Sequence, residues 1–156
     1  MRDLTPSQKG AAAEAAIAAA AIRMGLVVLR PLCEGGRYDL VIDLEPDLLR
    51  VQCKWATRRD RALSINLSGS RLTPRGYVRN KYTAEEVDAI GAYSAELESC
   101  FLIPIAEVNE RRGVRLRLEP ARNNQARRIR WAHEYEFEEM LSQARSRLLC
   151  PDRAAG

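Results

Sequence analysis

The stretch YDLVIDLEPDLLRVQCKW, residues 38–55, decides the fold. Two runs rich in Val, Ile and Leu occupy Tyr38–Leu44 and Leu48–Trp55, and the turn-forming Glu45-Pro46-Asp47 separates them. Short apolar runs on either side of turn residues predict a β-hairpin. The polar residues of this hairpin indicate where the chemistry of the protein lies.

These polar side chains fall on shared faces, because successive side chains of a strand point to opposite sides of a sheet. One face of the first strand carries Asp39, Val41 and Asp43, and one face of the second carries Arg50, Gln52 and Lys54. If the strands pair about Pro46 and Asp47, position 43 lies opposite 50, 41 opposite 52, and 39 opposite 54. Asp39, Gln52 and Lys54 would then converge on one patch.

This patch contains the groups that a metal-dependent phosphodiesterase needs. A hard divalent cation such as Mg²⁺ prefers oxygen ligands, which Asp39, the side-chain carbonyl of Gln52 and the backbone carbonyl of Cys53 could provide. Lys54 would hold the attacking water and stabilise the charge that builds on a phosphate. The pattern also fits an ordinary exposed sheet face, whose acidic and basic side chains pair across the strands.

A long helix is expected before the hairpin. Thr5-Pro6-Ser7-Gln8 has the pattern of a capping box with Pro at the first helical position, and Gly25 is a natural stop, which predicts a helix over Pro6–Met24. Glu14 stands out in this helix because its neighbours three and four positions away are small or apolar. Either this face is exposed to solvent, or Glu14 points into the cation site.

The remaining elements predict one α/β domain over residues 1–150, followed by a tail at 151–156. A strand at Leu26–Leu32 and a loop at 33–37 lead from the helix into the hairpin. Further strands are expected at Ala62–Leu67, Val87–Tyr93, Cys100–Ile105 and Val114–Leu118, and a closing amphipathic helix at Glu134–Leu149. The expected architecture is a mixed central sheet flanked by helices, which begins in the order αβββ.

YDLV followed by RVQCKW resembles the motifs of the PD-(D/E)xK nuclease superfamily, in particular the branch of group I intron homing endonucleases whose second motif reads QxK. Residues 9–14, KGAAAE, resemble the KGxxxE helix motif of that branch, and the phrases VDAIGAY, CFLIPI and NNQ with its following WA are similar too. The chain departs from the superfamily pattern at Tyr38, in place of Pro, and at Gln52, in place of Asp or Glu. The second departure removes a formal charge and should weaken metal affinity.

The resemblance implies a restriction-endonuclease-like αβββ core and a site-specific double-strand DNA endonuclease. It implies that Glu14 joins Asp39, Gln52 and the Cys53 carbonyl around Mg²⁺, with Mn²⁺ as a substitute, and that Lys54 positions the attacking water. Cutting both strands with one site per chain implies a homodimer or a homotetramer. The alternatives are a Holliday-junction resolvase with the same site and a DNA-binding protein that has lost its activity through Gln52.

Two basic segments are candidates for DNA contacts. RLTPRGYVRNKY, residues 71–82, is too broken for a helix, and it predicts either a solvated charged loop or a loop that grips the DNA backbone. The basic residues of this segment are Arg71, Arg75, Arg79 and Lys81. Asn123, Asn124, Gln125 and Arg127 could contact base edges, although the same residue types also serve turns and phosphates.

Composition limits the class of protein. At 156 residues with 46% hydrophobic and 29% charged residues, the chain is typical of a soluble globular protein, and its net charge of +4 is too modest an excess to identify a partner. The Ala-rich stretch near the N-terminus contains Glu14 and predicts neither a signal peptide nor a membrane span. A cytoplasmic location is therefore expected. The four cysteines are scattered and form no CxxC pair, so free thiols are expected.

Overall fold

The computed structural model describes residues 3–33, 35–120 and 129–149. Their helices and strands, in chain order, are α1 (Pro6–Arg23), β1 (Val27–Leu29), β2 (Leu40–Asp43), β3 (Leu48–Arg59), β4 (Ala62–Asn66), β5 (Gly69–Thr73), β6 (Gly76–Asn80), β7 (Ala89–Ser94), β8 (Ser99–Pro104), α2 (Ile105–Val108), β9 (Gly113–Arg117), the 3-10 helix η1 (Ala132–Tyr135) and α3 (Phe137–Leu149). The expected helix and three strands at the start of the chain are present. Asn123, Asn124, Gln125, Arg127 and the tail at 151–156 lie outside the described residues.

Helix α1 forms where its capping signals predict. The Thr5 side chain accepts a hydrogen bond from the Gln8 backbone, the Gln8 side chain accepts one from the Thr5 backbone, and Pro6 opens the helix. After the helix ends at Arg23, Gly25 adopts the left-handed φ of 77° that glycine tolerates. Among the described helices, none combines the length and the apolar character that a bilayer crossing requires.

The hairpin of β2 and β3 has a different register from the predicted one. Asp43 pairs with Leu48 and Val41 with Arg50, so the strands are shifted by two residues from a pairing about Pro46 and Asp47. The cause is a turn centred on Glu45 and Pro46, in which Asp43 Oδ1 accepts a hydrogen bond from the Glu45 N–H (2.9 Å) and Glu45 has a positive φ of 43°. Because the shift is an even number of residues, every side chain keeps its predicted face.

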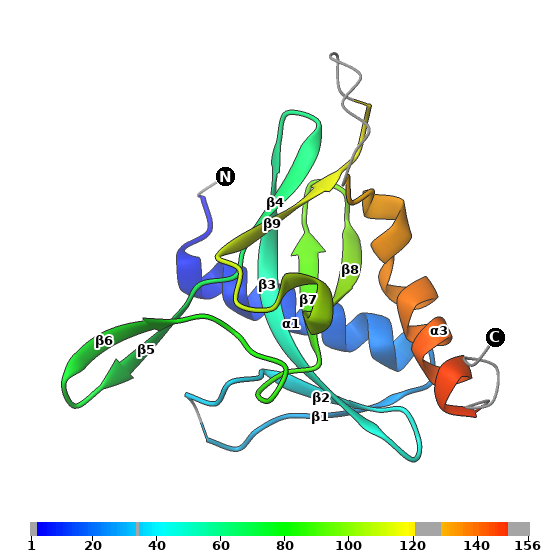
Figure 1. The fold of residues 1–156 in the computed structure, drawn as a ribbon, viewed down its shortest axis with the longest axis horizontal. Helices are drawn as coiled ribbons and strands as arrows, with labels where there is room; N and C mark the ends of the chain where they lie inside the picture. The colour runs from blue at the N-terminus through cyan, green and yellow to red at the C-terminus, as the bar shows by residue number, and fades with distance from the viewer. Residues whose placement is uncertain (1–2, 34, 121–128, 150–156) are drawn as a thin grey trace.

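Strand β3 is the axis of the sheet (Figure 1). It pairs with β2 over Leu48–Val51, with β7 over Val51–Trp55 and with β4 over Ala56–Arg59. The β3–β7 pairing is parallel and the other pairings are antiparallel, and in the described residues they join β1, β2, β3, β4, β7, β8 and β9 into one mixed sheet. The prediction of a mixed central sheet is therefore confirmed.

Helices α1 and α3 cover one face of the sheet. Ile17 of α1 and Phe137 of α3 share a buried cluster with Leu40, Val51 and other residues of β2, β3, β7 and β8. The helix approaches closely at Gly91, where a Cβ atom would lie 2.9 Å from Val51 Cγ1 and 3.0 Å from Ile17 Cδ1. A second buried cluster, which includes Ile65, Ile90 and Leu116, packs on the opposite face.

Three predicted elements differ from the structure. The strand expected over Leu26–Leu32 is limited to β1, Val27–Leu29, and the closing helix is divided into η1 and α3. The segment 71–82 was expected to be a loop, but much of it belongs to an antiparallel hairpin of β5 and β6 whose strands pair only with each other among the described residues. This hairpin extends away from the rest of the molecule (Figure 1).

Candidate functional site

Asp39 immediately precedes β2 and lies beside the middle of β3. Its backbone N–H donates to the Val51 carbonyl (3.0 Å), which extends the strand pairing by one residue. Its side chain accepts two hydrogen bonds at Oδ2, from Gln52 Nε2 (2.5 Å) and from the Cys53 backbone N–H (2.8 Å). The structure therefore brings Asp39 and Gln52 together, with Gln52 buried at 8% exposure.

The register of the sheet explains why the site forms here. Gln52, Cys53, Lys54 and Trp55 lie between the part of β3 that pairs with β2 and the part that pairs with β4. In this interval the Cys53 N–H donates its hydrogen bond to the Asp39 carboxylate and not to a carbonyl of a neighbouring strand. Since the N–H and C=O of one residue in a strand point to the same edge, the Cys53 carbonyl also points to the side on which Asp39 lies.

Glu14 reaches this region from α1. Its carboxylate pairs with Arg30, whose Nη2 lies 2.7 Å from Glu14 Oε2, and its side chain is 27% exposed. Burial and then the charge of Asp39 raise the pKa of Glu14, while Arg30 acts in the opposite direction. The Asp39 carboxylate thus acts on Glu14 through its charge, and Glu14 does not point into open solvent. The Arg30 partner was missed from the sequence, because it comes from the segment after β1.

The carboxyl of Asp39 is also costly to ionise in this environment. Burial raises the pKa of Asp39, against the opposing effects of the Cys53 N–H, the Lys54 and Arg30 charges and the Gln52 amide. Burial, reinforced by Asp39 and Glu14, strongly raises the pKa of the Cys53 thiol as well. Cys53 therefore stays a neutral thiol, and the groups that can carry negative charge here are the two carboxylates.

The donor set at this point suits a hard divalent cation. The described residues contain no group of three or more His, Cys, Asp or Glu side chains that could hold a metal ion, so an ion held by the two carboxylates would need further oxygen ligands from amide groups, the main chain, water or substrate. Asp39, Glu14, the Gln52 amide and the Cys53 carbonyl supply oxygen donors of that kind. In the structure the Gln52 amide directs its Nε2 toward Asp39. For both residues to bind one cation, the amide would have to turn so that Oε1 replaces Nε2.

Lys54 lies on the same face of β3 as Gln52. It contacts Tyr82, a residue that the sequence pattern does not link to it. Its Nζ lies over the ring of Tyr82, 4.9 Å from the ring centroid, and the Arg37 guanidinium carbon lies over the same ring at 4.8 Å. Lys54 also lowers the pKa of Asp39 through its charge. In the sequence, Tyr82 stands only as an aromatic residue at the end of the basic segment 71–82, a pattern that indicates DNA contact and not a contact with Lys54.

Glu86 and Asp88 have structural partners. Asp88 accepts hydrogen bonds from the backbone N–H (2.7 Å) and from Nε (3.0 Å) of Arg50. Burial raises the pKa of Asp88, but the Arg50 contacts outweigh it and lower that pKa overall. Glu86 pairs with Arg37 at 2.8 Å.

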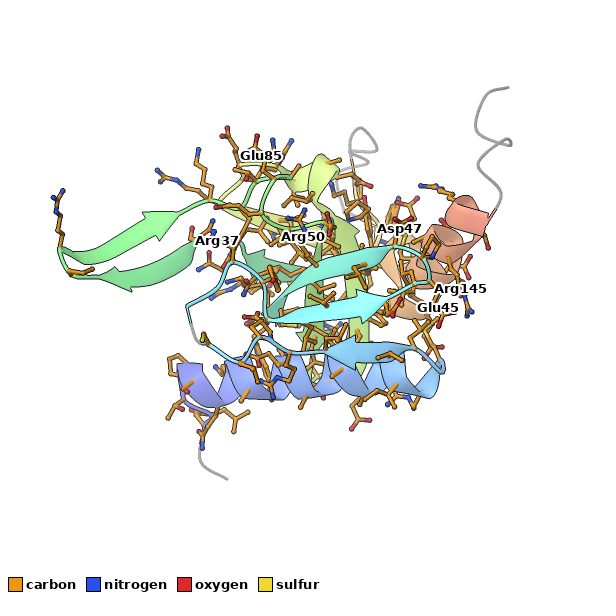
Figure 2. The ribbon with its side chains drawn as sticks, turned by 90° about the horizontal axis from the view of Figure 1, so that it is seen from below. Arg37, Glu45, Asp47, Arg50, Glu85 and Arg145 are labelled. Carbon is orange, nitrogen blue, oxygen red and sulfur yellow. The ribbon has the colours of Figure 1, made fainter. Side chains whose placement is uncertain are left out.

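The candidate DNA-binding residues of the 71–82 segment lie on or next to the projecting hairpin. Arg71 belongs to β5, Arg79 to β6, Arg75 to the exposed turn between them, and the exposed Lys81 follows β6 directly. Figure 2 shows the hairpin extending from the body of the molecule, with Arg37 near its base.

Comparison with known proteins settles the family. Residues 4–138 match the profile described as PD-(D/E)XK endonuclease. The chain belongs to this family. It also matches the solved structure of a bacterial homing endonuclease, I-Ssp6803I, with a TM-score of 0.68 and 27% sequence identity over 93% of this chain and 99% of that one. No match was found among curated proteins.

Membership of this family makes the protein an endonuclease and therefore a hydrolase. Nucleases of the PD-(D/E)XK family typically use divalent metal ions. The predicted fold, a restriction-endonuclease-like domain, agrees with the structural match.

Proposed function

We propose that the protein is a Mg²⁺-dependent, site-specific endonuclease of the homing type that cuts both strands of duplex DNA. The observation that carries this proposal is the convergence of Asp39, Gln52 and Glu14 beside Lys54, in a chain that matches a bacterial homing endonuclease over 93% of its length. The substrate class rests on that likeness together with the net charge of +4.

The proposed metal ligands are Asp39, Glu14, Gln52 and the Cys53 backbone carbonyl, with Mg²⁺ as the ion and Mn²⁺ as a substitute. When bound, the ion would supply charge stabilisation at the scissile phosphate and a lowered pKa for an attacking water. The raised pKa values of Asp39 and Glu14 support this role, because a bound cation offsets the cost of burying each carboxylate and the effect of the Asp39 charge on Glu14.

Lys54 is the proposed catalytic cation. Its ammonium can donate hydrogen bonds to the attacking water and to a phosphate oxygen, and three rotatable donors let it serve both. The Asp39 carboxylate, held at Oδ2 by Gln52 and the Cys53 N–H, gives the ammonium a fixed negative neighbour. This arrangement keeps a positive group at the site in the absence of substrate.

We propose that four basic residues on or next to the β5–β6 hairpin contact the phosphates of duplex DNA. They are Arg71, Arg75, Arg79 and Lys81. For base contacts we propose Asn123, Asn124, Gln125 and Arg127. Because each chain offers one such site, a double-strand cut requires at least a homodimer, and a homotetramer is the further possibility.

The test is cleavage by the purified protein, with Mg²⁺ or Mn²⁺, of linear duplex DNA spanning candidate target sequences and of a four-way junction. We expect cutting of linear duplex at one sequence, and loss of cutting in Asp39→Ala and Lys54→Ala with duplex affinity retained. Arg61→Ala, which removes a charge that pairs with Glu119 in another part of the sheet, is the matched control and should cut normally.

Each other result selects a different interpretation. Full cleavage activity of Lys54→Ala would show that this group of residues is not the active site. Cutting of the junction regardless of sequence would indicate a resolvase, and binding without cutting under every metal would indicate an inactive DNA-binding protein.

A further inference from the structure

Tyr82 is a buried aromatic residue at the base of the β5–β6 hairpin. It follows the end of β6 by two residues, and its side chain is 5% exposed. The Lys54 ammonium and the Arg37 guanidinium both lie over its ring, at 4.9 Å and 4.8 Å from the centroid. Hydrophobic packing does not require two cations on one buried ring, so these contacts call for a separate explanation.

The ring restricts an otherwise flexible side chain. A lysine ammonium is a point charge on a four-carbon stem, and an aromatic face attracts it more strongly when water is excluded. The Lys54 charge also interacts with the Asp39 carboxylate, whose pKa it lowers. Attraction by the ring and by the carboxylate together limits where the ammonium can lie.

Arg37 forms hydrogen bonds with residues on both sides of Tyr82 in the sequence. Its Nη2 donates to the Lys81 carbonyl (2.6 Å) and to Glu86 Oε2 (2.9 Å). Glu86 in turn accepts hydrogen bonds from the backbone N–H and the hydroxyl of Thr83, both at 3.2 Å. The chain on both sides of Tyr82 is therefore tied to Arg37, which lies two residues before Asp39 in the sequence.

We propose that Tyr82 is a positioning residue for Lys54 and that, through it, the base of the β5–β6 hairpin sets the place of the catalytic ammonium. This inference rests on the proposed function of Lys54. Tyr82 has no contact with the reacting atoms in this scheme and acts through the lysine alone. The aromatic face is the part of the side chain that matters, so phenylalanine should replace tyrosine and leucine should not.

Single-turnover cleavage at saturating DNA tests this role. We expect Tyr82→Leu to lower the rate by about 10- to 100-fold, because small misplacements of a catalytic group have effects of that order, while DNA affinity stays unchanged. Tyr82→Phe should keep the wild-type rate. Tyr135→Leu removes another buried tyrosine, 7% exposed, from the same hydrophobic cluster and should lower stability without lowering the rate. A wild-type rate in Tyr82→Leu, or equal losses in Tyr82→Leu and Tyr82→Phe, would overturn the proposal.

A second measurement does not depend on cleavage. The chain contains three lysines, Lys9, Lys54 and Lys81, so NMR of lysine-labelled, metal-free protein gives few side-chain signals. The Lys54 signals should show a ring-current shift that Tyr82→Leu abolishes and Tyr82→Phe retains, with Lys9, which lies over the Trp55 ring at 5.9 Å, as the reference that neither substitution changes. Unchanged Lys54 signals in Tyr82→Leu would refute the contact. If the wild-type protein cuts no DNA, the proposed function fails, and the NMR result still decides whether Tyr82 places Lys54.

Discussion

Replacing Gln52 with glutamate tests the chemistry of the site in the metal-free and the metal-bound protein. The change restores the charge usual at this position of the superfamily, and in the absence of metal it removes the hydrogen bond from Gln52 Nε2 to Asp39 Oδ2. It also introduces a third carboxyl group beside Asp39 and Glu14, at a position that is 8% exposed. We therefore expect Gln52→Glu to destabilise the metal-free protein and to tighten Mg²⁺ binding.

The magnitude follows from the lost contact. A hydrogen bond to a charged group contributes about 1.5–3 kcal/mol, and a domain of this size loses about 2–4 °C in Tm per kcal/mol. The expected decrease in Tm without metal is therefore about 3–12 °C. Gln52→Met is the matched control, because it removes the hydrogen bond without adding a charge.

The pH dependence separates the charge from the hydrogen bond. The new carboxyl should have a raised pKa in the folded protein, since burial raises the pKa of its neighbour Asp39, and burial with the Asp39 charge raises that of Glu14. A folded state that holds more protons than the unfolded state loses stability as pH rises through the folded-state pKa. Gln52→Glu should thus approach Gln52→Met in stability at low pH and fall below it as pH rises toward 8.

Thermal melts from pH 5 to 8, in EDTA and in Mg²⁺, provide the assay. A tenfold gain in Mg²⁺ affinity corresponds to about 1.4 kcal/mol, so saturating Mg²⁺ should raise the Tm of Gln52→Glu by about 3–6 °C more than that of the wild type. The reasoning would be refuted by a metal-free variant as stable as the wild type at pH 8. A Mg²⁺ response no larger than that of the wild type would exclude Gln52 as a metal ligand.

Three further predictions address DNA binding, Mg²⁺ binding and the packing of α1 against the sheet. The triple variant of Arg75, Arg79 and Lys81 to alanine should bind all duplexes more weakly, with a slope of log affinity against log salt that is shallower by about 2–3 units per protomer; an unchanged slope would place the DNA contacts elsewhere. Glu14→Gln should weaken Mg²⁺ binding about tenfold or more, and a titration of cleavage against Mg²⁺ with an unchanged midpoint would exclude this residue as a ligand. Gly91→Ala should cost about 1–3 kcal/mol in urea denaturation, because its Cβ meets β3 and α1 at 2.9–3.0 Å, whereas wild-type stability would show that the helix shifts freely.

Features that depend on neighbours in the sequence were predictable. The capping box of Thr5 and Gln8 set the start of α1, and the alternation of side chains placed Asp39, Gln52 and Lys54 on shared faces. The face assignment survived an error in register because the error was an even number of residues. The shift itself came from the turn, where Glu45 adopts a left-handed conformation that its residue type does not signal.

The immediate surroundings of the site depend on segments that are distant in the sequence. Arg30 reaches Glu14 from the end of the first strand, and Tyr82 reaches Lys54 from beyond the β5–β6 hairpin. A pattern of residues specifies which side chains share a face of one element, because that follows from local backbone geometry. It does not specify which element packs over that face, since many arrangements bury the same apolar residues. The local sequence thus determined the candidate ligands and the lysine, and only the tertiary structure decided the partners that orient them.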